Sequence, residues 1–139
     1  MFNPRKCKFV AGSDAELGLY GNRLEKVESF VYLGVDMNET GALWSQHFER
    51  RRRLATTALK MLKSFGFHGY GLGERTNLMA YKAIIRPALE FGLTVMPPIK
   101  AVLKMLDRAQ VSFLRQMFTL PQNASGVALR VMCALPSFT

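Results

Sequence analysis

The pattern of apolar and polar residues divides the chain into a strand-rich part and a helical part. Up to residue 37, short runs with aromatic and β-branched residues alternate with Gly, Ser and Asp, as is typical of short strands. These runs are Cys7–Ala11, Leu17–Tyr20, Arg23–Val27 and Phe30–Val35. Gly21-Asn22 suits a tight turn, because both residues tolerate positive φ. We predict an antiparallel meander of two to four strands, which needs a helix to cover its apolar face.

Helical periodicity begins at Ala42 and is predicted to continue to about Phe65. A glycine-rich break over residues 66–73 precedes a second helix, from Glu74 to about Phe91. Pro87 lies inside this second helix and is expected to kink it. The apolar face of the first helix consists of Trp44, Phe48, Ala55, Ala58, Leu59, Leu62 and Phe65, and that of the second of Leu78, Tyr81, Ile85 and Leu89.

A third helix is predicted after Pro97-Pro98, a pair that stops one segment and suits the first turn of the next. Its apolar face runs from Ile99 to Met117, and Asn123 or Ser125 is expected to cap a short final helix. The chain therefore predicts an α+β fold. A small antiparallel β-meander over residues 1–41 is followed by a bundle of three to four helices over residues 42–139, which folds as one unit.

The charge of the chain is distributed unevenly. Residues 1–49 contain five Lys/Arg and seven Asp/Glu, a net charge of −2, whereas residues 50–139 contain fourteen Lys/Arg and three Asp/Glu, a net charge of +11. Such asymmetry points to a polyanionic partner, either nucleic acid or an acidic membrane surface. The alternative is a basic surface without a partner.

The cysteines and the hydropathy of the chain indicate the compartment in which the protein resides. Cys7 and Cys133 lie near opposite ends of the sequence and are expected to be free thiols in a reducing compartment. The most apolar stretch, Ala88–Ile99, contains Glu90 and two prolines, so no segment is expected to cross a bilayer. The first twelve residues lack the apolar region of a secretory signal. We expect an intracellular protein, nuclear or cytoplasmic, without a membrane partner, and leave an organelle address open.

An ordered series of motifs extends over most of the chain. Asn3-x-x-Lys6-Cys7 is followed by Gly21, by Tyr32-Leu33-Gly34 and by Trp44-x-x-His47 at the start of an arginine-rich helix. Val27 lies between Gly21 and Tyr32, and the series continues after His47 with Tyr81, Arg86-Pro87, Leu89-Glu90, Gly92, Leu106-Asp107, Ala109-Gln110 and Leu114-Arg115. It resembles non-LTR (LINE-type) retrotransposon reverse transcriptases, from the end of the palm through the primer-grip hairpin into the thumb. Phe91 departs from the family, which more often has Tyr there.

The resemblance implies a thumb-like, nucleic-acid-binding part of an RNA-directed DNA polymerase. Tyr32 and Gly34 would lie on one side of a primer-grip strand, where a glycine lets a sugar-phosphate backbone approach. The alternative is that Tyr32 is a core aromatic and Gly34 merely ends a strand. In the family the metal-binding aspartates precede this region, so we expect no polymerase activity from the chain on its own. It would be a fragment, a degenerate reading frame or a domesticated thumb module.

Four successive arginines, Arg50 to Arg53, occupy different faces of the first predicted helix. A helical wheel places Arg51 in the apolar face, Arg52 at its margin, and the other two towards solvent. A buried guanidinium needs a partner, so Arg51 is expected to be structural and to pair with Asp107 or Glu90. The residues expected to contact phosphate are Arg50, Arg53 and Lys60. The alternative is a solvated run of charge.

Lys100, Lys104, Arg108 and Arg115 form a basic stripe on the third predicted helix, opposite its apolar face. Such a stripe can follow a nucleic-acid backbone without reading bases. Ordinary helix solubility explains the same pattern, and both explanations are left open.

Other motifs argue against enzymatic chemistry. The glycines of residues 66–73 resemble a phosphate cradle, but no Lys-Ser/Thr pair follows them, so a hinge is favoured. His47 and His68 have no neighbouring metal ligands in the sequence, and we expect neither a metal nor another cofactor. His47 is instead expected to form a hydrogen bond near the start of its helix. No adjacent acids and no Ser-His-Asp or Cys-His arrangement suggest a catalytic centre.

Two functional hypotheses follow. The first is a nucleic-acid-binding module that favours RNA or an RNA–DNA duplex and recognises charge and shape rather than sequence. The second is a domesticated structural or protein-interaction domain without a nucleic-acid role, which docks on a catalytic palm domain or another protein. An exposed apolar patch near Phe9, Tyr20 or Leu33 would favour the second hypothesis, and a continuous basic groove beside the helices the first.

Overall fold

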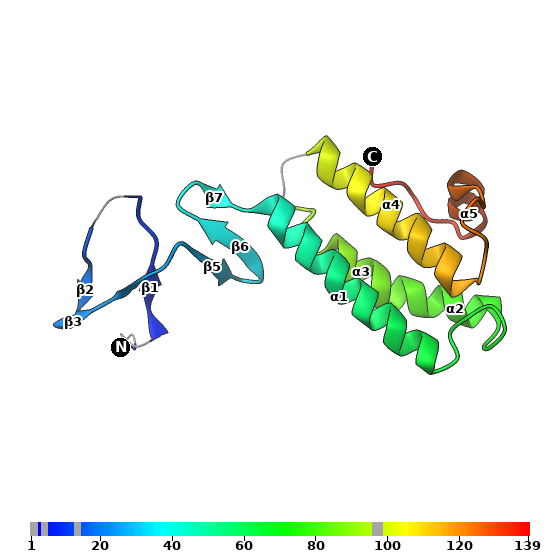
Figure 1. The fold of residues 1–139 in the computed structure, drawn as a ribbon, viewed down its shortest axis with the longest axis horizontal. Helices are drawn as coiled ribbons and strands as arrows, with labels where there is room; N and C mark the ends of the chain where they lie inside the picture. The colour runs from blue at the N-terminus through cyan, green and yellow to red at the C-terminus, as the bar shows by residue number, and fades with distance from the viewer. Residues whose placement is uncertain (1–2, 4–5, 13–14, 96–98) are drawn as a thin grey trace. The chain divides into compact units, whose positions relative to one another are not determined.

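The chain forms two compact units, residues 1–47 and 48–139 (Figure 1). The structure is a computed structural model and describes residues 3, 6–12, 15–95 and 99–139. Short strands occupy the first unit and helices the second, so the predicted α+β fold is confirmed. The boundary between the units falls at His47, inside the first helix, whereas the sequence predicted it at residue 41.

The described residues of the strand unit form three small sheets. A three-stranded antiparallel sheet is formed by β5 (Ser29–Tyr32), β6 (Val35–Asn38) and β7 (Gly41–Ala42). The other two sheets pair β2 (Gly18–Leu19) with β3 (Asn22–Arg23) in antiparallel orientation, and β1 (Lys8–Phe9) with β4 (Glu25–Lys26) in parallel orientation. The antiparallel meander is thus confirmed for β5–β6–β7. The parallel β1–β4 pair was not predicted, nor were β6 and β7 as separate strands.

Among the described strands, two of the three hairpin turns consist of residues with positive φ. Tyr32 pairs with Val35, so Leu33 and Gly34 form the β5–β6 turn, with φ of 49° and 82°. Two successive positive φ values are typical of a type I′ turn, whose twist matches that of the strands. The prediction that Gly34 lies on a strand beside Tyr32 is therefore wrong. The other of these two turns is Tyr20-Gly21, one residue earlier than predicted.

The β5–β6 turn can be stabilised by one substitution. Leu33 adopts a left-handed backbone that costs an ordinary residue about 1–2 kcal/mol, and its side chain is 79% exposed. Asparagine tolerates this conformation, and Asn-Gly is the preferred pair of type I′ turns. We expect Leu33→Asn to slow amide hydrogen exchange in β5 and β6 by a factor of about 2–5, because the turn loses strain. Exchange that is unchanged or faster than in the parent chain would contradict this assignment of the turn.

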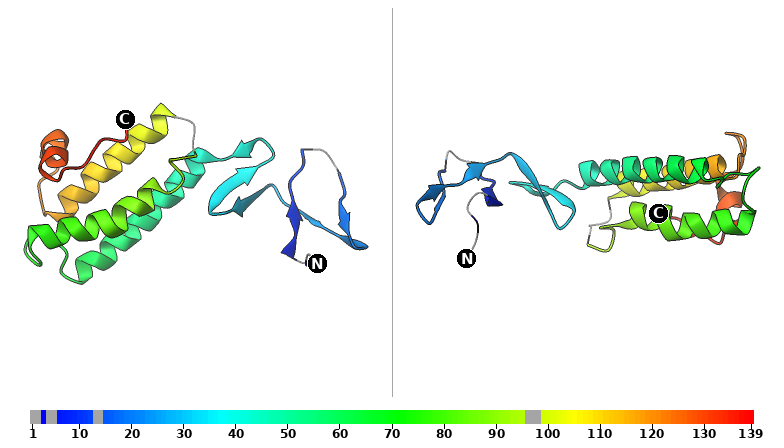
Figure 2. Two further views of the ribbon diagram at one scale, coloured as in Figure 1. Left: turned by 180° about the vertical axis from the view of Figure 1, so that it is seen from behind. Right: turned by 90° about the horizontal axis from the view of Figure 1, so that it is seen from below.

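The helical unit is built in two layers. Figure 2 shows α1 and α4 together in one layer, with the long α2–α3 segment packed against them. The helices are α1 (Trp44–Ser64), α2 (Glu74–Ala80), α3 (Arg86–Glu90), α4 (Lys100–Met117) and α5 (Gly126–Met132), with the π-helical turn η2 (Tyr81–Ile85) joining α2 to α3. α1 begins in the strand unit and continues through the helical one.

The core of the helical unit comes from the predicted apolar stripes. Its fully buried side chains include Phe48 and Leu59 of α1, Tyr81, Ile85 and Leu89 of the α2–α3 segment, and Leu106, Leu114 and Met117 of α4. Phe65 is an exception, since its side chain is exposed. α1 ends at Ser64, so Phe65 lies beyond its last residue. Gly66, with a φ of 89°, then turns the chain, and Phe65 does not continue the apolar stripe into the core. The prediction of a core position for Phe65 is therefore wrong.

Pro87 is accommodated by the π-helical turn η2. The backbone N–H of Arg86 donates to the carbonyl of Tyr81, five residues earlier, so the helix is wider immediately before the proline. In a regular helix the proline ring would clash with the carbonyl four residues before it, and a wider turn relieves that clash. The helical segment thus continues to Glu90. The predicted disturbance at Pro87 takes the form of a π-helical turn.

Helix ends further along the chain follow the sequence signals only in part. The side chain of Ser125 accepts a hydrogen bond from the N–H of Ala128 at 3.3 Å, so Ser125, not Asn123, caps α5. Pro97-Pro98, the predicted stop before α4, lies outside the described residues.

Candidate nucleic-acid interface

The arginine run of α1 spreads around the helix. Arg50, Arg51 and Arg52 are half-buried, and Arg53 is exposed. Arg52 donates two hydrogen bonds to the carboxylate of Glu49, from Nε at 2.9 Å and from Nη2 at 2.7 Å. Arg53 approaches the same carboxylate at 3.4 Å. One glutamate therefore holds two of the four arginines.

Arg51 packs on an aromatic ring. Its guanidinium carbon lies 3.8 Å from the centre of the Phe91 ring, a distance at which a cation is attracted to the face of the ring. Glu90 accepts a hydrogen bond from Arg86 at 2.6 Å, and Asp107 pairs with Arg130 at 3.4 Å. The two acids predicted to serve Arg51 thus have other cationic partners, from their own helix or from α5. Phe91, where the resembled family more often has Tyr, is the contact that the sequence did not predict.

The basic stripe of α4 is only partly available to a ligand. Lys100, Lys104 and Arg108 are exposed, as predicted. Arg115 is half-buried, and its guanidinium donates to the carbonyl of Ala124, from Nε at 3.1 Å and also from Nη2. It thereby fixes the loop between α4 and α5. The prediction that Arg115 contacts phosphate is replaced by this structural contact.

A groove between α1 and α4 brings arginines of both helices together. Its volume is about 460 Å³, and it is lined by Glu49, Arg52, Ala101, Met105, Arg108, Ala109, Ser112 and Phe113. Small residues on α4, Ala101, Ala109 and Ser112, leave space between the two helices. Lys104 lies one helical turn before Arg108, and Lys100 one turn before Lys104, so both extend the cationic surface along α4. Arg53 and Lys60, seven residues apart, share the outer face of α1.

The sequence did not identify Arg52 and Glu49 as site residues. The spacing of three and four residues from Glu49 to Arg52 and Arg53 was the available signal, because such pairs are neighbours on a helix. Facing helices cannot be identified from one sequence, which is why the groove itself was missed.

Tyr32 and Gly34 belong to the strand unit. Tyr32 is 58% exposed and contacts Phe30 edge to face, with 6.5 Å between ring centres. The alternative that Tyr32 is a core aromatic is therefore wrong, and Gly34 serves the turn. Other apolar side chains of this unit are also exposed, namely Leu17, Tyr20, Val31 and Leu33, whereas Phe9 is half-buried.

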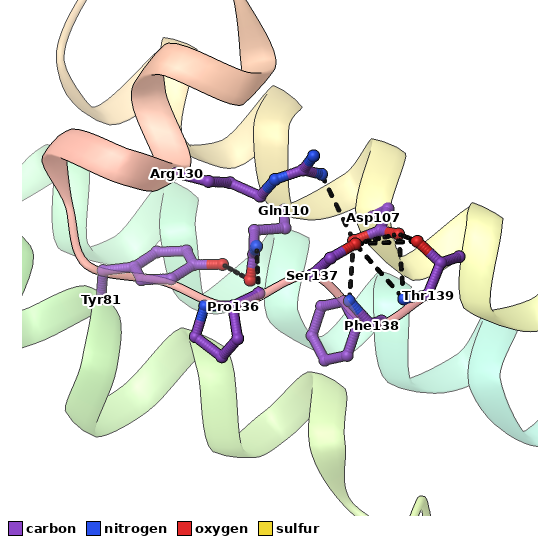
Figure 3. A network of polar contacts seen from close by, with 8 residues as sticks. All are labelled: Tyr81, Asp107, Gln110, Arg130, Pro136, Ser137, Phe138 and Thr139. Carbon is purple, nitrogen blue, oxygen red and sulfur yellow. Dashed lines mark hydrogen bonds and ion pairs between the residues drawn. The ribbon is translucent and has the colours of Figure 1, made fainter.

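Asp107 anchors the C-terminal segment to α4, as Figure 3 shows. Its carboxylate accepts hydrogen bonds from the hydroxyl of Ser137 at 2.8 and 2.9 Å, from the N–H of Phe138 at 2.9 Å and from the hydroxyl of Thr139 at 2.7 Å. Burial alone would raise the pKa of Asp107, but these hydrogen bonds and the charge of Arg130 outweigh it, so its pKa is lowered. Asp107 thus anchors the C-terminal segment, a role that the sequence did not predict, since it was expected to pair with Arg51.

Buried polar side chains join this segment to the core. Gln110 donates to the carbonyl of Pro136 at 3.2 Å, and the hydroxyl of Tyr81 lies 3.5 Å from the Oε1 of Gln110 (Figure 3). Burial raises the pKa of Tyr81 beyond its usual range, so the phenol stays protonated. Tyr81 is therefore a core residue.

The glycine-rich loop is closed by its own contacts. The side-chain amide of Asn77 donates to the carbonyls of His68 and Leu72, each at 3.1 Å, and the N–H of Leu72 donates to the carbonyl of Gly66 at 2.8 Å. The N–H of Gly69 donates to the hydroxyl of Thr119 at 3.1 Å. These contacts hold the loop against α2 and the end of α4 and engage N–H groups that a phosphate cradle would need, whereas the hinge stays a prediction.

The two cysteines and His47 are the other candidates for chemistry in the sequence. Cys7 and Cys133 are both free thiols, as predicted, and burial raises the pKa of Cys133. His47 is fully buried, and its Nδ1 lies 3.6 Å from a carboxylate oxygen of Asp36 in β6. Within the described ranges, no three His, Cys, Asp or Glu residues are grouped so that they could hold a metal ion.

Comparison of the chain with protein families, with curated proteins and with solved structures finds no match. The resemblance to reverse transcriptases therefore rests on the ordered motifs alone. Among the described residues, none of the helices has the length and apolar character needed to cross a membrane.

Proposed function

We propose that the helical unit binds the phosphate backbone of nucleic acid along the groove between α1 and α4. The observation that carries the proposal is the position of Arg52 and Arg108, which come from two different helices and line one groove. Guanidinium groups match the geometry of phosphate, and a groove lets both helices contact one backbone.

The surrounding charge supports this proposal. Residues 50–139 carry a net charge of +11, and Lys100 and Lys104 continue the cationic surface beyond the groove. Of the three acids in these residues, Glu90 and Asp107 are engaged by Arg86 and Arg130. The lining of the groove carries two arginines against one glutamate, and a cationic surface attracts a polyanion over a distance set by the salt concentration.

The motifs suggest which nucleic acid binds. Their resemblance to the primer-grip and thumb region of non-LTR reverse transcriptases favours an RNA–DNA hybrid or duplex RNA, recognised by shape and charge rather than by bases. On this proposal the chain is a binding module of a polymerase-like protein and has no polymerase activity by itself. The metal-binding aspartates would come from a catalytic palm domain.

The test is a salt series of binding measurements with four polyanions. RNA–DNA hybrid, duplex RNA, duplex DNA and heparin are titrated by fluorescence anisotropy between about 50 and 200 mM salt. We expect affinity to fall linearly on a log–log scale, with a slope of about −0.9 per phosphate contact for a duplex, and the hybrid or duplex RNA to bind more tightly than heparin. Equal affinity for heparin and for all three nucleic acids would mean that only charge density is recognised, and would contradict a nucleic-acid interface.

A second function is favoured by the exposed side chains of the strand unit. Tyr20, Tyr32 and Leu33, together with Leu17 and Val31, have exposed side chains and present apolar surface. Such surfaces are typical of protein interfaces. On this alternative the strand unit docks on a protein, such as a palm domain, and nucleic-acid binding is not required. A correctly folded chain that binds none of the four polyanions would favour this alternative.

A further inference from the structure

Glu49 occupies Arg52, which a ligand of the groove would need, and also Arg53 on the outer face of α1. Its carboxylate accepts two hydrogen bonds from Arg52, at 2.7 and 2.9 Å, and lies 3.4 Å from Nε of Arg53. Glu49 lines the same groove as Arg52 and Arg108. Its side chain is 34% exposed, so the ion pair can be reached from solvent.

The ion pair persists over the physiological pH range. The hydrogen bond from Arg52 is the main reason that the pKa of Glu49 is lowered, although burial opposes it, and the charge of Arg53 adds to the effect. The same hydrogen bond raises the pKa of Arg52. Both groups are therefore ionised near neutral pH, and Glu49 neutralises part of the cationic charge at the groove.

A carboxylate and a phosphate compete for the same donors. The Nε and one Nη of arginine form a planar fork that binds two oxygens of either anion, and Glu49 already fills this fork. The side chains of Arg52 and Glu49 are 42% and 34% exposed, so the ion pair is screened by solvent and can open when a more highly charged anion arrives.

We propose that Glu49 is a built-in competitor for phosphate, which holds Arg52 and Arg53 in the free protein and releases them to the nucleic acid. This inference rests on the proposed function. It assigns Arg52, which is absent from the phosphate contacts predicted by the sequence, as a phosphate-binding residue. It also means that every binding event must first break the Glu49 ion pair, which lowers the apparent affinity of the groove.

The test compares Glu49→Gln with Glu74→Gln in the whole chain. Both substitutions remove one negative charge, but Glu74 is exposed on α2 and does not line the groove. With duplex RNA as the probe, we expect Glu49→Gln to bind about tenfold more tightly than the parent at low salt. Its salt slope is expected to stay close to that of the parent, because the same arginines reach phosphate in both complexes. Glu74→Gln is expected to change affinity by less than about twofold.

A second pair of variants shows whether the gain acts through Arg52 and Arg53. In a chain that carries Arg52→Ala and Arg53→Ala, the further substitution Glu49→Gln is expected to give no gain beyond that of Glu74→Gln. A circular-dichroism melt of each variant checks that the fold is retained. Glutamine is close in size to glutamate and keeps one acceptor for the arginines, so the fold should be unaffected.

The outcomes separate this inference from the proposed function. If the parent binds duplex RNA and Glu49→Gln binds no more tightly than Glu74→Gln, Glu49 is not a competitor, while the proposed interface stands. If neither the parent nor Glu49→Gln binds, the proposed function fails and this inference fails with it. A gain in Glu49→Gln that persists without Arg52 and Arg53 would also overturn it.

Discussion

Replacing Lys104 and Arg108 by glutamate is expected to weaken binding of duplex RNA by at least about tenfold. The magnitude of the salt slope is expected to fall by about 1.8, because each phosphate that is no longer neutralised contributes about 0.9. Both side chains are exposed on α4, and Arg108 lines the groove opposite Arg52. Reversing their charge removes two cations and places two anions where a phosphate would lie. Anisotropy titrations at several salt concentrations measure both quantities.

A matched control separates a local effect from a change in net charge. Arg75 and Lys82 are exposed on the α2–α3 segment and do not line the groove. Replacing both by glutamate changes the net charge by the same amount. We expect this control to retain most of the affinity, because exposed charges beyond about one Debye length are screened. An equal decrease in affinity for the two double variants would mean that the whole basic surface, not the groove, attracts the nucleic acid.

The helical part of the fold was predictable because its stripes are long and regular. Leu59, Ile85, Leu89, Leu106 and Leu114 recur at helical spacing, and all are buried where the wheel placed them. Each stripe needs a partner surface, so three such helices in succession predict a bundle. The wrong predictions of buried positions concern residues at the ends of the apolar stripes. Phe65 follows the last turn of α1, where a periodic argument no longer applies.

The strand unit was less predictable, since its strands have only two to four residues. At this length a period of two cannot be distinguished from chance. Tyr32-Leu33-Gly34 has the β-branched and aromatic surroundings of a strand, but Leu33 and Gly34 take positive φ and form a turn. A leucine in this conformation contradicts local propensity, and only the pairing of β5 with β6 shows it.

The candidate site was predictable as a set of basic residues but not as a surface. Helical spacing identified Lys104 and Arg108, because they lie opposite an apolar stripe. It misplaced Arg115, whose guanidinium binds the carbonyl of Ala124 in the following loop. It did not predict the contact of Arg51 with Phe91, since no periodicity brings Phe91 to α1. Contacts between distant segments depend on packing and are not encoded in a single helical wheel.

Asp107 on α4 joins distant segments of the chain through the hydrogen bonds that it accepts from Ser137, Phe138 and Thr139. Removing these hydrogen bonds is expected to have the largest effect on stability. Asp107→Asn removes the charge and turns an amide NH₂ towards donors from Ser137, Phe138 and Thr139. The side chain is only 13% exposed, so water cannot fully replace these hydrogen bonds. We expect the free energy of unfolding, measured by urea denaturation near pH 7, to fall by about 2–4 kcal/mol. Glu74→Gln, at an exposed position, should change it by less than about 0.5 kcal/mol.

The pH dependence of this destabilisation tests its electrostatic origin. Because the pKa of Asp107 is lowered in the folded chain, its ionised form stabilises the fold above the unfolded pKa, near 4, and this contribution disappears as pH falls through the folded value. The difference in unfolding free energy between the parent and Asp107→Asn should therefore be constant from about pH 7 to pH 5 and shrink below about pH 4. Glu49, whose pKa is also lowered, titrates in both proteins and cancels from the difference. A difference that is the same at pH 7 and pH 3 would show that the destabilisation comes from shape rather than from the charge of the carboxylate.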